Sequence, residues 1–89
     1  MTDWVADIRI LLKPSVNDPQ GLSIRNALRT LGFDGIEDVR AGKLIELRVS
    51  AGSRLAAEQT VDAMCAQLLA NPVIETYTFT LDEVPAPVL

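Results

Sequence analysis

Apolar side chains alternate with other residues near the N-terminus. Between residues 4 and 12, one face of an extended chain carries Trp4, Ala6, Ile8, Ile10 and Leu12. This period of two is typical of a half-buried β-strand. Lys13-Pro14 is expected to end the strand, because proline lacks the backbone N–H of a ladder and restricts the residue before it.

A helix is predicted to follow. Asp18 suits the N-cap, and Pro19 suits the first helical position, where a missing N–H costs nothing. Apolar side chains then recur at spacings of three and four residues: Ile24, Ala27, Leu28 and Leu31. Gly32 is expected to close this helix in the left-handed conformation.

Two short strands are predicted over residues 36–40 and 44–49, on either side of residues 41–43. Gly42 in this break fits either a tight hairpin or a bulge in one long bent strand. We favour the hairpin.

The last part of the chain predicts a second helix and a final strand. Ser53 is positioned to cap the helix, and Asn71-Pro72 to stop it. The apolar stripe of this helix consists of Val61, Met64, Cys65, Leu68 and Leu69. Residues 73–81 alternate again and are rich in residues that favour strands. Residues 82–89 are expected to form an extended or flexible tail.

The predicted order is therefore β-α-β-β-α-β in a single domain over residues 1–89. We expect an α+β two-layer sandwich of the ferredoxin-like type. It would have a mainly antiparallel four-stranded sheet, two helices on one face and right-handed crossovers. The second face would stay uncovered, and 48% of the residues are hydrophobic, so we expect homo-oligomers.

Composition excludes several kinds of chemistry. The chain has no histidine and one cysteine, which excludes histidine-based catalysis, thiolate zinc sites and internal disulfides. Twelve acidic against eight basic residues give a net charge of −4, which argues against nucleic-acid binding. The sequence shows no apolar run of about 20 residues and no secretory leader, so we expect a cytoplasmic chain without a membrane partner.

Few local clusters suggest a site. Cys65 lies on an apolar stripe and is interpreted as a small core residue. Gly42-Lys43 lacks the spacing and the hydroxyl residue of a phosphate-binding loop. Arg40, Lys43 and Arg48 either gather to hold an anion or a partner carboxylate, or are ordinary surface charges. Ordinary surface charge is the favoured interpretation.

Three motifs nevertheless resemble one known family. The first is Leu-Lys-Pro-Ser-Val-Asn-Asp-Pro-Gln-Gly at residues 12–21, and the second is Val-Arg-Ala-Gly-Lys-Leu-Ile-Glu-Leu at residues 39–47. The third runs from Met64-Cys65 through Leu-Leu-Ala-Asn-Pro-Val-Ile-Glu at residues 68–75 to Tyr77. Their order and spacing are similar to those of PurS, the small subunit of phosphoribosylformylglycinamidine synthase.

The resemblance implies a function that the composition does not. It implies a non-catalytic subunit in purine biosynthesis, which bridges a glutaminase subunit (PurQ) and a synthetase subunit (PurL) for ammonia transfer. It also implies a homodimer or homotetramer. ATP and magnesium would belong to the large subunit, and no catalytic, cofactor-binding or metal-binding residue is expected in this chain.

Partner contacts are expected where the motifs are densest. The candidate residues are Lys13, Pro14, Asp18, Arg40, Lys43, Asn71 and Glu75. The alternative is that the prolines and glycine of these motifs serve turn geometry alone. Two other functions stay open: a ferredoxin-like small-molecule-binding regulatory module and a minor nucleic-acid-binding protein.

Overall fold

A three-stranded antiparallel sheet forms the centre of the fold in the computed structural model, which describes residues 1–84. The central strand β1 (Thr2–Leu12) pairs with β2 (Gly42–Ala51) on one side and with β3 (Glu75–Glu83) on the other. Because both outer strands are antiparallel to β1, they run parallel to each other. β3 thus includes two residues of the predicted tail, and residues 85–89 of that tail lie outside the described residues.

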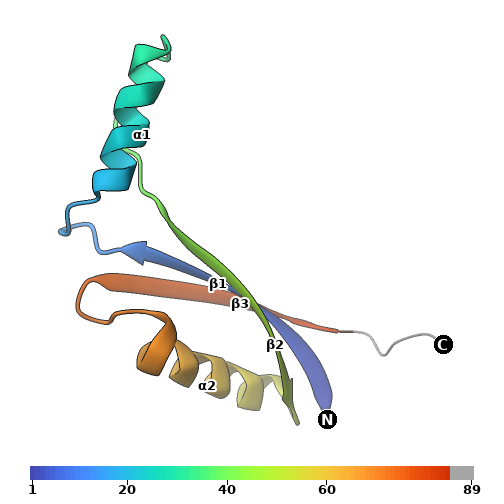
Figure 1. Ribbon diagram of the computed structural model, residues 1–89. Helices are drawn as coiled ribbons and strands as arrows, with labels where there is room; N and C mark the ends of the chain where they lie inside the picture. The colour runs from blue at the N-terminus through green and yellow to red at the C-terminus, as the bar shows by residue number, and fades with distance from the viewer. Residues whose placement is uncertain (85–89) are drawn as a thin grey trace.

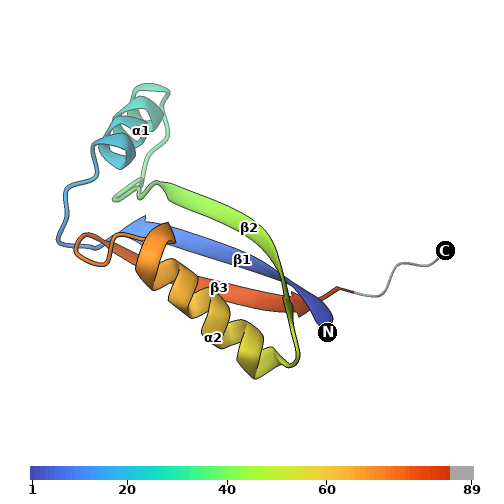
Figure 2. The same ribbon diagram turned by 60° about the horizontal axis from the view of Figure 1, so that its bottom comes forward.

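The core lies between one face of this sheet and the helix α2 (Arg54–Met64), as Figure 2 shows. The helix continues into a single π-helical turn, η1 (Cys65–Leu69). Ser53 caps α2 as predicted, accepting a hydrogen bond from the Ala56 backbone N–H. The buried side chains of α2 and η1 recur every four residues: Ala57, Val61 and Cys65.

The sheet contributes the even-numbered residues of β1 to this core. Ala6, Ile8 and Ile10 are at most 1% exposed, which confirms the period of two in the sequence. The Arg54 guanidinium closes one end of the core over the Trp4 ring, 5.1 Å from its centroid. The opposite face of the sheet is largely polar and includes the cross-strand neighbours Asp7 and Glu46. The sheet is therefore apolar on one face only.

The predicted fourth strand is absent from the described residues. Residues 36–40 have no regular secondary structure and belong to a return segment, residues 33–41, that leads from α1 back to the sheet. The backbone carbonyls of Ile36 and Glu37 accept hydrogen bonds from arginines of α1 instead of a neighbouring strand. The prediction of a ferredoxin-like four-stranded sheet with a hairpin at Gly42 is therefore wrong in this detail, although the α+β class is confirmed.

The helix α1 (Pro19–Thr30) has the predicted ends. Asp18 is its N-cap, Pro19 its first residue, and Gly32 follows its C-terminus with φ of +95°. The Gly32 and Phe33 amides donate to the Arg29 and Leu28 carbonyls, which is the Schellman arrangement.

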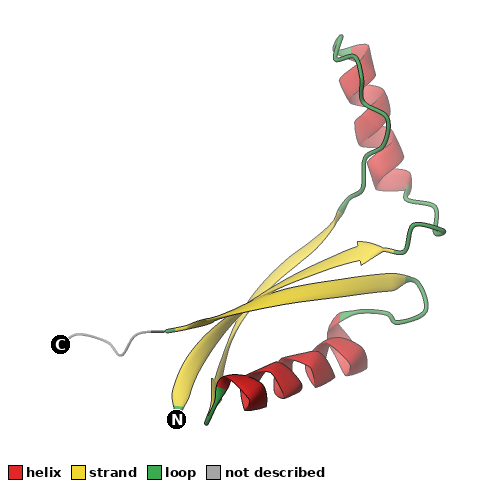
Figure 3. Cartoon of the chain, turned by 180° about the vertical axis from the view of Figure 1, so that it is seen from behind, coloured by secondary structure: helices red, strands yellow, loops and turns green. Residues whose placement is uncertain are grey.

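The position of α1 differs from the predicted one. β1 and β2 are direct antiparallel neighbours with Leu11 opposite Gly42, so residues 13–41 form an insertion between two adjacent strands. In Figures 1 and 3, α1 stands off the end of the sheet instead of lying beside α2. The expectation of two helices on one sheet face, joined by two crossovers, is therefore wrong for α1.

Candidate functional site

The three sequence motifs meet at one end of the sheet, where β1 ends and both outer strands begin. Lys43 lies opposite Ile10, and Glu75 lies opposite Leu12. The Lys13 amide donates to the Ile74 carbonyl at 2.8 Å, which joins the first motif to the third. We call this region the motif end of the sheet.

Asp18 links the two chain segments that connect α1 to the sheet. Its side-chain carboxylate accepts from the Gly21 amide at 2.9 Å and from the Ala41 amide at 2.9 Å. These two backbone hydrogen bonds stabilise the charged form and lower the pKa of the carboxyl below its ordinary value of 3.8. Asp18 is buried, and its carboxylate has a structural role within the chain.

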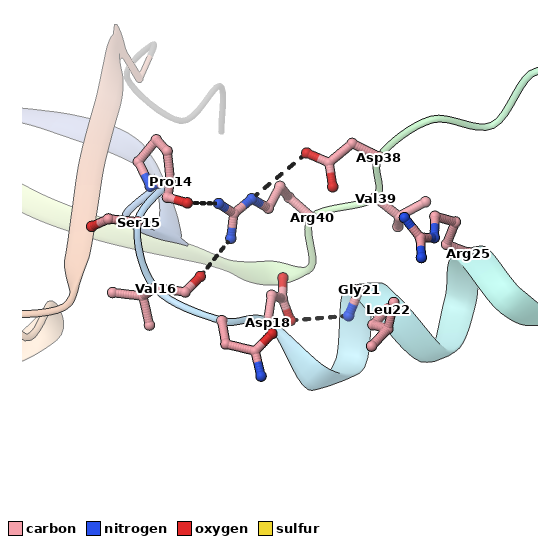
Figure 4. Close-up of a pocket in the computed structure, with 11 residues that line it drawn as sticks. Pro14, Ser15, Val16, Asp18, Gly21, Leu22, Arg25, Asp38, Val39 and Arg40 are labelled. Carbon is pink, nitrogen blue, oxygen red and sulfur yellow. Dashed lines mark hydrogen bonds and ion pairs between the residues drawn. The ribbon is translucent and has the colours of Figure 1, made fainter.

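Arg40 reinforces the same junction from the other side. Its guanidinium donates to the carbonyls of Pro14 at 2.6 Å and Val16 at 3.1 Å, and lies 4.0 Å from an Asp38 carboxylate oxygen. Figure 4 shows this side chain pointing into the turn that contains Pro14 and Val16. A hydrogen-bonding role within the chain is thus established for Arg40.

Gly21 is a further essential part of this junction that the sequence reasoning did not single out. A Cβ atom at this position would lie 2.1 Å from the Val39 carbonyl oxygen, so only glycine lets the first turn of α1 approach the return segment this closely. A glycine inside the first turn of a helix was the available signal, because glycine is a poor helix former. Arg25 and Arg29, which bond the return segment, were also missed.

Asn71 and Glu75 form a turn of their own between η1 and β3. The Asn71 side chain accepts from the Val73 amide at 3.0 Å, and the Glu75 side chain accepts from the Asn71 amide at 2.7 Å. The Asn71 carbonyl also accepts from the Glu75 amide at 2.7 Å. These bonds give both residues a local structural role.

Among the candidate residues at the motif end, Pro14, Lys43 and Asn71 are exposed, and Lys13 is half-buried beside them. Within residues 1–84, neither lysine ammonium takes part in an ion pair. Arg48 does not join them, because it lies five residues from Lys43 on the opposite face of β2. The predicted cluster of Arg40, Lys43 and Arg48 is therefore not formed.

A cavity of about 310 Å³ lies between the two connections of α1. Its polar lining includes the Asp18 and Arg40 side chains, whose hydrogen bonds hold the junction together. No group of three potential metal ligands occurs within residues 1–84. Over the same residues, no helix has the length and apolar character needed to cross a membrane.

Cys65 has the position expected of a core residue, and three of the four aromatic residues pack in the same core. Cys65 is fully buried, and burial raises the pKa of its thiol above the ordinary value of 9.0. Trp4 is buried, while Tyr77 and Phe79 pack against the same core. The Tyr77 hydroxyl donates to Asp62 at 2.6 Å, and this bond raises the pKa of the tyrosine above 10.0.

Comparison with known proteins gives a consistent result across the chain. Residues 5–83 match the family model described as "PurS: Phosphoribosylformylglycinamidine (FGAM) synthase". The chain is 49% identical over 74 residues to the phosphoribosylformylglycinamidine synthase subunit PurS of Synechocystis, covering 83% of this chain and 74% of that one. The corresponding subunit of Bacillus subtilis is 40% identical over 79 residues, covering 89% and 93%.

Solved structures agree with the sequence relatives. The structure of Thermus thermophilus PurS superposes with a TM-score of 0.84 at 42% identity, covering 93% of this chain and 99% of that one. A chain in the structure of PurLQS from Thermotoga maritima superposes with a TM-score of 0.82 at 33% identity, covering 94% and 100%. Both similarities cover more than nine-tenths of this chain.

Proposed function

Because the chain belongs to the PurS family of phosphoribosylformylglycinamidine synthase subunits, we propose that it joins the glutaminase and synthetase subunits of that enzyme. The observation that carries the proposal is the match over residues 5–83 together with the fold it shares with a chain of the PurLQS assembly. A small-molecule-binding regulatory module is not favoured, since the family match accounts for all three motifs.

The proposed reaction is that of the assembled enzyme, which converts formylglycinamide ribonucleotide, ATP and glutamine to the amidine. ATP and magnesium would bind the synthetase subunit. We assign this chain a structural rather than a catalytic role. The Asp18 and Arg40 side chains support this assignment, because both are engaged in hydrogen bonds to the chain's own backbone. Cys65 is a buried thiol, which suits the reducing cytoplasm where we place this subunit.

The proposed contact surface consists of the exposed Pro14 and Lys43 and the half-buried Lys13 beside them. Asp18, Arg40, Asn71 and Glu75 would act indirectly, by fixing the turns that hold these residues in place. A positive pair on a chain of net charge −4 would steer a partner carboxylate to one end of the molecule.

A bridge acts by binding the docked pair of enzymes more tightly than the separated ones. Holding the two active sites together raises the effective concentration of one at the other. Ammonia released by the glutaminase would then reach the synthetase before it escapes to solvent.

The function is tested with the purified glutaminase and synthetase subunits, with and without this chain. We expect the chain to restore glutamine-dependent synthesis of the amidine and to leave synthesis from ammonium chloride largely unchanged. A rise of both rates would show that the chain activates the synthetase itself. No change in either rate would refute the proposed function.

The contact surface is tested by Lys43→Glu, with Arg48→Glu as the matched control on the same strand. We expect Lys43→Glu to weaken binding to the synthetase or the glutaminase about 5- to 30-fold, the effect of losing a well-placed contact. Arg48→Glu should leave both affinities within about twofold, since surface changes away from a contact are nearly neutral. Equal effects of the two substitutions would remove Lys43 from the contact surface.

A further inference from the structure

The face of the sheet that points away from α2 is mostly polar but has an apolar patch at one corner. Leu44 of β2 is 68% exposed there, and Leu11 of β1 is 42% exposed. Leu44 lies opposite Arg9, and Leu11 lies opposite Gly42. The two leucines therefore occupy neighbouring cross-strand rows on one face. Single exposed leucines are ordinary on a protein surface, whereas these two form a continuous patch.

An open cavity of about 270 Å³ lies at this patch. Its lining, which we call the corner pocket, consists of Arg9, Ile10, Leu11, Gly42, Lys43 and Leu44. A Cβ atom at position 42 would lie 2.1 Å from the Ile10 carbonyl oxygen and 2.6 Å from a Leu11 methyl carbon, so only glycine fits there. Position 42 thus adds no side chain to this face, and the space beside the two leucines stays open.

The charges around the corner pocket are positive. Its lining includes two cations, Arg9 and Lys43, and no acid. The nearest acids on this face of β1 and β2, Asp7 and Glu46, form the next cross-strand row and do not line the pocket. Over residues 1–84, neither cation takes part in an ion pair. An apolar patch beside an unpaired guanidinium fits an apolar side chain that has a carboxylate next to it.

The part of the chain that the structure describes leaves the corner pocket uncovered. The pocket is lined by β1 and β2 alone, and α2 packs against the other face of the sheet, as Figure 2 shows. A second copy of this chain is a poor occupant, because a two-fold contact at this pocket would place Arg9 of one copy against Arg9 of the other. The charge therefore favours a different protein with an acidic segment.

We propose that the corner pocket binds an acidic segment of the synthetase subunit, which places one apolar side chain against Leu11 and Leu44 and a carboxylate beside Arg9. The inference rests on the proposed function, because the pocket adjoins the proposed contact surface at Lys43 and specifies the partner chemistry there. The synthetase is the large subunit of the proposed complex, so it offers more surface than the glutaminase from which such a segment can come.

The test uses Leu44→Glu, with Leu55→Glu as the matched control. Leu55 is 63% exposed, close to the value for Leu44, but lies in the first turn of α2. We expect Leu44→Glu to weaken binding to the synthetase at least about 30-fold, as for a central contact. Leu55→Glu should stay within about twofold of the wild type. Arg9→Gln should weaken binding about 3- to 10-fold at low salt and less at high salt, because salt screens the lost ion pair.

A crosslinking experiment covers the case in which Leu44→Glu does not fold. The single cysteine of the chain, Cys65, is fully buried, so Leu44→Cys can be labelled at one exposed thiol with benzophenone maleimide. Irradiation in the presence of both enzyme subunits should link residue 44 to the synthetase. A crosslink only to the glutaminase, or only to another copy of this chain, would overturn the proposal.

The binding results separate this inference from the proposed function. A wild-type chain that does not restore glutamine-dependent synthesis would refute both. If the wild type restores synthesis but Leu44→Glu binds the synthetase as tightly as the wild type, or no more weakly than Leu55→Glu, only the corner pocket is refuted. Loss of self-association by Leu44→Glu in sedimentation velocity would also refute it, since the pocket would then be a contact between copies.

Discussion

Gly21→Ala tests whether the close approach of α1 to the return segment fixes the helix in place. Alanine in place of glycine inside a helix normally stabilises a protein by about 1 kcal/mol. Here the new Cβ would lie 2.1 Å from the Val39 oxygen, and real Cβ atoms keep at least 3.0 Å. The Val39 carbonyl must therefore move by at least 0.9 Å, the difference between those two distances.

The displacement opposes the gain in helix propensity. Forcing an extra carbon into a packed site costs about 1–3 kcal/mol, so we expect a net loss of about 1 kcal/mol and up to about 2 kcal/mol. Val39 lies two residues before Ala41, whose backbone amide donates a hydrogen bond to the Asp18 carboxylate. Its movement should also weaken that bond and accelerate hydrogen exchange at the Ala41 amide.

Urea denaturation at one fixed chain concentration measures the loss, because any self-association would make the stability depend on concentration. Gly52→Ala is the matched control, since nothing lies within 4 Å of a Cβ at that position. Gly52→Ala should lower the free energy of unfolding by no more than about 0.5 kcal/mol. A small increase is also consistent, because alanine reduces the entropy of the unfolded chain. A Gly21→Ala protein as stable as the wild type, with unchanged exchange at Ala41, would refute the reasoning.

Three further predictions concern single titratable groups. Tyr77 is the one tyrosine of the chain, so the absorbance of tyrosinate should titrate with a midpoint above 10.0. Asp62→Ala should lower that midpoint by removing the acceptor of the tyrosine hydroxyl; equal midpoints would contradict the hydrogen bond. The pKa of Asp18 is lowered in the folded state, so its contribution to stability is present above 3.8 and is lost as the pH falls from there through the lowered pKa. Protection factors at Gly21 and Ala41 should fall over that range relative to those in β1, and this difference should be missing in Asp18→Asn. Cys65 is buried with a raised pKa, so a disulfide reagent should modify it slowly in the native protein and rapidly in urea; equal rates would place the thiol at the surface.

The sequence alone determined the helix caps and the strand alternation, which depend on neighbours within a few residues. The Asp18 and Ser53 caps, the Gly32 terminus and the alternation of β1 all agree with the structure. Capping bonds and side-chain periodicity act over three or four positions, so the residues themselves carry the information. The three motifs also identified the family, because each is a short run of residues that can be recognised in the sequence. The structure shows that they meet at one end of the sheet.

Only the tertiary structure decided how residues 33–41 and α1 are placed. Residues 36–40 were predicted to form a short strand, but Arg25 and Arg29 supply the hydrogen-bond donors that a neighbouring strand would have supplied. From the sequence, Asp18 is predicted only to cap a helix. The fold also places the Ala41 amide, 23 residues away, against its second carboxylate oxygen. These choices depend on segments distant in the chain, and local pattern does not specify which distant group will satisfy a given backbone amide or carbonyl.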